Sequence, residues 1–146
     1  NASMTRLNSL IDLMKTETLG GERLIDNPLY RERLMKIQGR VMAMRYNDMR
    51  VLSSRLNKDE EAPLARMITK LQGTELRHEL EALAIDAMGE VGLSFGSNPY
   101  LRGGGSWHYQ FMYFLGLIIG GGTNQIQKNI ISERGLGMPK EPKIEK

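Results

Sequence analysis

The sequence predicts an all-α fold, namely an up-down four-helix bundle followed by a short C-terminal helix. Two observations lead to this fold class. Apolar residues recur at steps of three and four through long segments of the chain, which is the spacing of one helix face. The turns between long segments are short, as they are between the antiparallel helices of a bundle. We expect no β-strand.

The first two helices are expected in the N-terminal part of the chain. Residues 5–15 carry an apolar stripe but start without a clear cap. Asn27 or Asp26 is suited to cap the second helix, because either side chain can accept backbone hydrogen bonds, and Pro28 fits the first turn. The apolar spacing continues to about Leu56, which gives a helix of about 40 Å at about 1.5 Å per residue.

The third helix follows a turn at residues 57–59. Pro63 lies in its opening turn, and its apolar stripe continues to Met88. Gly73 in the middle is unfavourable by about 1 kcal/mol relative to alanine, so we expect another helix to pack closely there. Residues 91–106 are rich in glycine, serine and proline and predict a loop.

The last two helices follow this loop. Residues 107–119 are apolar on most sides, so the fourth helix should be covered on several sides, in part by another subunit. The fifth helix is expected to begin at Thr123 and to stop at Gly135 or Gly137.

The length of 146 residues corresponds to one domain. We assign residues 5–139 to the helical bundle. Residues 1–4 are interpreted as a remnant of the expression vector together with the start of the protein. Residues 140–146 are expected to form a flexible tail.

The composition excludes several classes of function. The absence of cysteine excludes disulfides and thiolate metal sites, and it is compatible with the reducing cytoplasm, where we expect the protein. The net charge of +3 is too small and too evenly spread for nucleic-acid binding, and no apolar segment is long enough to span a membrane. His78 and His108 lack metal-ligand spacing. We interpret them as a solvated and a packing or capping residue, and Arg102 as an exposed loop arginine.

The most informative segment, residues 120–139, reads Gly-Gly-Gly-Thr-Asn-Gln-Ile-Gln-Lys-Asn-Ile-Ile-Ser-Glu-Arg-Gly-Leu-Gly-Met-Pro. Three glycines allow positive φ or a close approach of the backbone to a ligand. Thr123 or Asn124 can cap the following helix, whose free N–H groups suit an anion such as phosphate. An ordinary glycine-rich turn between two helices explains the same residues.

The same segment resembles the C-terminal signature of the acyl-CoA dehydrogenases, which usually reads Gly-Thr-x-Glu/Gln-Ile-Gln-Arg-Asn-Ile-Ile-Ala-Glu-Arg-x-Leu-Gly-Leu-Pro. Most consecutive positions agree, and a weaker resemblance extends over almost the whole chain. The resemblance implies that the chain is the C-terminal helical bundle of such an enzyme, cut within its first helix. It also implies two missing preceding domains, one helical and one β, which hold much of the FAD and of the acyl-CoA pocket.

The resemblance further implies which residues contact the cofactor and the substrate. Thr123, Asn124 and Gln125 match family residues that contact FAD, and Gly122 matches one beside the substrate. Elsewhere the pattern is weaker. The family's Arg-x-x-Phe-Gly aligns with residues 17–21, where the Arg and Phe are absent.

Two further glycines mark departures from the family pattern. The family's Gln before Phe-Gly-Gly aligns with Gly89, and only Gly92 remains of that motif, which we also assign to cofactor binding. The family removes a proton α to the thioester and passes a hydride to the flavin, so it needs a carboxylate base. In many members this base is a Glu directly before the Gly-Thr, where this chain has Gly121; in others it lies upstream of Asn1. We therefore expect no catalytic residue in this chain.

These expectations define one leading function and two alternatives. The leading hypothesis is the FAD-contacting and oligomerisation domain of an acyl-CoA dehydrogenase, which oxidises the α,β C–C bond of an acyl-CoA thioester in a homo- or hetero-oligomer. The isolated chain should be inactive. The alternatives are a non-catalytic assembly domain whose base comes from a partner chain, and an acyl-CoA oxidase-like flavoenzyme.

Overall fold

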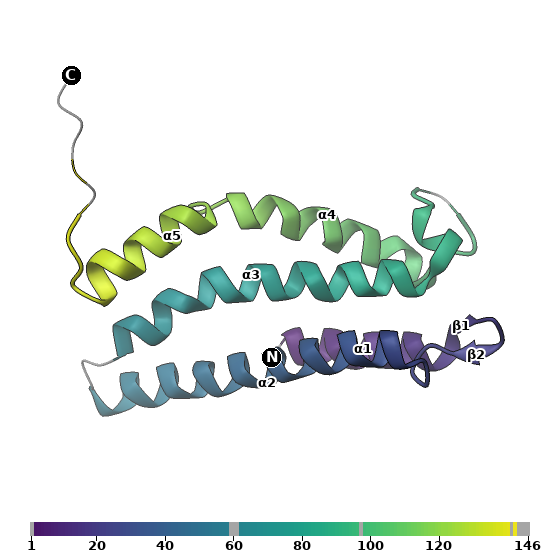
Figure 1. Ribbon diagram of the computed structural model, residues 1–146, viewed down its shortest axis with the longest axis horizontal. Helices are drawn as coiled ribbons and strands as arrows, with labels where there is room; N and C mark the ends of the chain where they lie inside the picture. Colours follow the sequence, from purple (N-terminus) through teal and green to yellow (C-terminus); the bar gives the residue numbers. More distant parts are fainter. Residues whose placement is uncertain (1, 59–61, 97, 141, 143–146) are drawn as a thin grey trace, which may run out of the picture.

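The computed structural model describes residues 2–58, 62–96, 98–140 and 142, and its helices form the expected all-α, up-down bundle (Figure 1). The four long helices run antiparallel in chain order. They are α1 (Ala2–Thr16), α2 (Pro28–Asn57), α3 (Ala62–Ala87) and α4 (Ser106–Ile119). The predicted fold class is therefore confirmed.

The helix α3 lies at the centre of the bundle. It packs against α2 on one side and α4 on the other, and α1 packs against both α3 and α2. The short helix α5 (Asn124–Ile130) continues in the direction of α4 along α3 and ends in a π-helical turn, η3 (Ile131–Gly135). The turn between α4 and α5 is therefore held against the middle of the molecule.

The cap of α2 agrees with the sequence. The side-chain oxygen of Asn27 accepts hydrogen bonds from the backbone N–H groups of Leu29 (3.1 Å) and Tyr30 (3.4 Å). At the other end Lys58 adopts a left-handed conformation, with φ of 52°, which ends the helix where the turn was expected.

The expectation of no strand was wrong at one place. Two-residue strands, β1 (Thr18–Leu19) and β2 (Glu22–Arg23), pair antiparallel after α1. Gly20 and Gly21 form the turn with φ of 60° and 85°, and positive φ at both central residues is what the tight hairpin turn requires. Strands this short show no alternation, so the glycine pair was their only sequence signal.

Three further expectations need correction. The helix α1 begins at Ala2, within the residues set aside from the fold, and the predicted loop contains the 3₁₀ turns η1 (Gly89–Leu93) and η2 (Arg102–Gly105). A Cβ atom added at Gly73 would meet nothing within 4 Å, so no close helix packing explains that glycine. In the expected tail, residues 141 and 143–146 lie outside the described residues.

The hydrophobic core lies between α1, α2 and α3 and uses the predicted stripes. Its buried residues include Leu7, Leu10, Met14, Leu34, Ile37, Val41, Leu76, Leu80 and Leu83. In the second half of α2 the stripe is exposed, as at Leu52, because α1 has 15 residues against 30 in α2 and covers only one half of it (Figure 1).

The histidines have different environments. His108 is buried and its Nε2 lies 2.8 Å from the carbonyl oxygen of Gly92, which confirms a packing role. His78 stacks on Phe111 with ring centroids 4.5 Å apart, so it is not the solvated residue that was expected. Arg102 is half-exposed and ion-paired to Glu17 at 2.5 Å, and this hydrogen bond raises the pKa of the guanidinium.

Candidate functional site

The predicted site lies at the turn that joins α4 to α5. Two of its glycines have positive φ, 70° at Gly121 and 98° at Gly122, which a residue with a side chain rarely adopts. Thr123 then caps α5, because its hydroxyl oxygen accepts the N–H of Ile126 at 3.4 Å. The glycines thus set the direction in which the chain enters α5.

Two side chains from α3 hold this turn. Nζ of Lys70 donates to the carbonyl oxygens of Ile118 (3.1 Å) and Gly122 (2.5 Å), one on each side of the turn. One helical turn further along α3, Oε1 of Glu75 accepts a hydrogen bond of 2.5 Å from Nδ2 of Asn124. The position of the turn therefore depends on α3.

The structure brings four of the five predicted site residues together, namely Gly122, Thr123, Asn124 and Gln125. Thr123, Asn124 and Gln125 lie at the start of α5, directly after Gly121 and Gly122. Gln125 is exposed, and its side chain makes no hydrogen bond within the described chain. Asn124 is half-buried, and its Oδ1 is a buried acceptor without a hydrogen-bond partner in the described part of the chain.

The fifth predicted residue, Gly92, lies elsewhere. It is buried in η1, before α4, whereas Thr123 follows α4, a helix of 14 residues that spans about 21 Å. A Cβ atom at Gly92 would lie 2.2 Å from the carbonyl oxygen of Ile85, so close backbone packing by itself requires a glycine. Its assignment to cofactor binding stays a prediction.

Gly121, at the position where many family members carry the catalytic Glu, has space for a side chain but no carboxylate. An added Cβ at Gly121 would meet only Cε of Lys70, at 4.0 Å, whereas at Gly122 it would lie 3.0 Å from Nε2 of Gln127. That Nε2 donates to the carbonyl oxygen of Gly121 at 2.8 Å. The turn is thus held by a hydrogen bond from α5, the helix that follows it, as well as by the side chains from α3.

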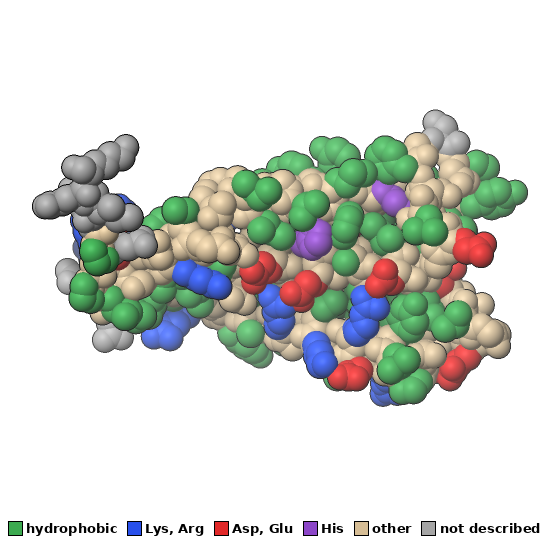
Figure 2. Space-filling view, turned by 45° about the horizontal axis from the view of Figure 1, so that its top comes forward, with side chains coloured by type: hydrophobic (Ala, Val, Ile, Leu, Met, Phe, Trp, Pro, Cys, Tyr) green, Lys and Arg blue, Asp and Glu red, His purple; other side chains and the backbone are tan. Residues whose placement is uncertain are grey.

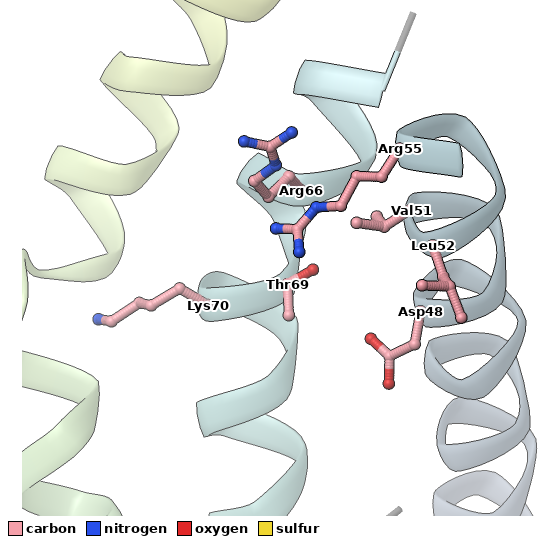
Figure 3. Close-up of a pocket in the computed structure, with 7 residues that line it drawn as sticks. All are labelled: Asp48, Val51, Leu52, Arg55, Arg66, Thr69 and Lys70. Atoms are coloured by element: carbon pink, nitrogen blue, oxygen red, sulfur yellow. The ribbon is translucent and has the colours of Figure 1, made fainter. Parts of the chain in front are cut away.

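A second polar site, which the sequence reasoning missed, is an open cavity of about 450 Å³ between α2 and α3. Its lining residues are Asp48, Val51, Leu52, Arg55, Arg66, Thr69 and Lys70 (Figure 3). Lys70 points away from Arg55 and Arg66, toward α4 and α5, which agrees with its bonds to the turn. Arg55 lies on α2 and Arg66 on α3, and no sequence signal indicated that these two cations would line one cavity.

No group of three His, Cys, Asp or Glu side chains in the described part of the chain is arranged to hold a metal ion. None of the helices in the same residues combines the length and apolar character needed to cross a membrane.

The bundle, together with the glycine turn that feeds α5, defines the class of protein. Residues 2–136 match the family model for the "Acyl-CoA dehydrogenase, C-terminal domain", and the chain belongs to this family. The predicted family resemblance is therefore confirmed. An acyl-CoA dehydrogenase family member is an oxidoreductase and a flavoprotein in general.

Particular relatives agree with this assignment. "Acyl-CoA dehydrogenase IpdE1" of Mycolicibacterium smegmatis is 33% identical over 81% of this chain and 28% of its own length, and that of Mycobacterium tuberculosis is 30% identical over 94% and 32%. The solved ChsE4-ChsE5 complex from Mycobacterium tuberculosis is similar with a TM-score of 0.79 and 25% identity, over 95% of this chain and 36% of that chain. The chain thus spans about a third of these relatives.

Proposed function

We propose that this chain is the FAD-contacting and oligomerisation domain of an FAD-dependent acyl-CoA dehydrogenase, which oxidises the α,β C–C bond of an acyl-CoA thioester. The observation that carries the proposal is the α4–α5 turn. It has the family signature at Thr123, Asn124 and Gln125 and is fastened to α3 by Lys70 and Glu75. A preorganised turn loses little conformational freedom when it binds a ligand.

The residues at this turn fit a flavin cofactor. Gln125 offers an exposed amide, and Oδ1 of Asn124 is an acceptor that lacks a donor within the described residues. Gly122, which matches a family residue beside the substrate, is half-buried and carries no side chain. When bound, FAD supplies the acceptor for the hydride that leaves the substrate; this chain's residues bind and orient it.

The catalytic base comes from outside this chain. Gly121 has no titratable group, and its φ of 70° suits glycine. A carboxylate must therefore be supplied by another part of the intact protein or by a partner chain. The source of the base separates the hypotheses, because in the alternative of a non-catalytic assembly domain the base comes from a partner chain.

The surface of α4 supports the oligomerisation role. No Lys, Arg, Asp or Glu occurs between Arg102 and Lys128. Hydrophobic side chains gather over α4 (Figure 2), among them the exposed Tyr109, Met112 and Ile119. Contiguous exposed apolar surface marks interaction sites. The ChsE4-ChsE5 relative is a complex, which favours an oligomer, homomeric or heteromeric.

The test is the flavin content of the intact protein that contains this chain, purified alone and with its partner subunit. We expect bound FAD and reduction of the flavin by an acyl-CoA. Flavin reduction without oxygen consumption would favour the dehydrogenase, whereas rapid reoxidation by oxygen would favour the oxidase-like alternative. A protein without flavin under both conditions would contradict the proposal.

A further inference from the structure

We propose that Lys70 is a positioning residue for the flavin-contacting turn, because its ammonium joins the end of α4 to the start of α5. This inference rests on the function proposed above. It concerns a residue on α3, more than fifty positions before the signature in the sequence, that contacts no reacting atom itself.

The geometry of Lys70 is that of a clamp. Its Nζ lies 3.1 Å from the carbonyl oxygen of Ile118, in the last turn of α4, and 2.5 Å from that of Gly122. The last carbonyls of a helix lack partners within the helix and form the negative end of its dipole. A cation at this place therefore satisfies α4 and holds Gly122 at the same time.

The turn needs such a clamp because of its composition. Residues 120–122 are all glycine, the residue with the greatest backbone freedom. The hydrogen bond from Gln127 to Gly121 joins the turn only to α5, so it does not hold the turn against the rest of the bundle. The bond between Glu75 and Asn124 fixes α5 but not the end of α4. Lys70 is the described side chain that bonds to both ends.

The cavity between α2 and α3 does not explain Lys70 as well as the turn does. Figure 3 shows its side chain directed away from the arginines of that cavity. Its Cε lies 4.0 Å from the place of a Cβ at Gly121, which puts the side chain along the turn itself. Loss of the ammonium should therefore loosen the turn and misplace Thr123 and Asn124 relative to the flavin.

The experiment measures FAD affinity and the flavin absorption spectrum of the intact protein, with its partner subunit, for Lys70→Met, Lys70→Gln and Lys70→Arg. We expect FAD to bind about ten- to a hundredfold more weakly in the Met and Gln variants, from the loss of charge-assisted hydrogen bonds. The flavin band should shift toward that of free FAD. Lys70→Arg keeps the cation and should recover most of the affinity.

Lys36→Met is the matched control, because Lys36 is an exposed lysine on α2 that forms a surface ion pair with Glu32. It should bind FAD as the wild type does. If Lys70→Met fails to fold, the FAD affinity of Lys70→Gln, which keeps an N–H donor, tests the inference. Unchanged affinity in the Lys70 variants would overturn the inference, and so would an equally large loss in Lys36→Met. A wild-type protein without FAD would instead contradict the proposed function.

Discussion

Arg6 on α1 and Glu81 on α3 form an ion pair in the interior of the bundle. Nε and Nη2 of Arg6 lie 2.8 Å and 2.6 Å from the two carboxylate oxygens of Glu81, whose side chain is fully buried. Arg77 adds a bond of 3.3 Å to the same carboxylate. The guanidinium of Arg6 also lies 3.4 Å from the ring centroid of Trp107, so the pair connects α1, α3 and α4.

Replacement of this buried carboxylate should be costly. Glu81→Gln keeps the shape but leaves two arginines without their counter-charge, and we expect a loss of about 3–5 kcal/mol in the free energy of unfolding. Urea denaturation of the chain measures this. Asp86→Asn is the control, because Asp86 is 52% exposed in its pair with Arg33, and it should cost at most about 1 kcal/mol. Equal losses would refute the special role of Glu81.

Two glycines should respond to alanine in opposite directions. At Gly121, with φ of 70°, alanine is expected to lower the free energy of unfolding by about 1–2 kcal/mol, because a side chain disfavours this conformation. At Gly73 the backbone is helical, and an added Cβ would meet no atom within 4 Å. Alanine there should therefore raise the free energy of unfolding by about 0.5–1 kcal/mol. Thermal or urea unfolding of both variants distinguishes them. A stabilised Gly121→Ala would show that the turn conformation is not required.

The apolar face of α4 should cause self-association. Tyr113 lies on this face and is half-exposed, so Tyr113→Glu places a charge there and should shift the chain toward monomer in analytical ultracentrifugation. Tyr46→Glu, at a tyrosine of α2 that is 62% exposed against 50% for Tyr113, is the control and should leave the assembly unchanged. A wild-type chain that sediments as a clean monomer would contradict this prediction.

The isolated chain should neither turn over an acyl-CoA nor hold FAD tightly. Gly121 stands where many family members carry the base, and the chain spans about a third of its curated relatives. Flavin absorbance after purification and acyl-CoA turnover with an artificial electron acceptor measure the two properties. The intact protein, assayed in parallel, is the positive control. Turnover by the isolated chain would place a base within these residues.

The helices could be predicted from the sequence because burial follows the three- and four-residue spacing. Asn27 caps α2 as expected, and Leu76 and Leu80 occupy the core. The spacing did not predict burial correctly in the second half of α2, where Leu52 is exposed because α1 does not extend along this half. Which neighbour covers a stripe is a property of the tertiary structure that the spacing does not contain.

The candidate site was predictable only in its local part. Thr123 and Asn124 were identified from a contiguous motif, and the structure places them at the start of α5. Lys70 and Glu75 were missed as its supports, because their contacts with the turn join positions about fifty residues apart. Such pairs leave no periodic signal in one sequence.

The measurement that tests the central claim most directly is the FAD affinity of Gln125→Ala in the intact protein. The side chain of Gln125 is exposed and makes no hydrogen bond within the described residues, so its removal should not affect folding. We expect about tenfold weaker FAD binding at an unchanged unfolding midpoint. The control is Gln38→Ala on α2, a helix that does not contain the turn, and this variant should bind FAD as the wild type does. Equal FAD affinity in the wild type and Gln125→Ala would contradict flavin contact at the start of α5.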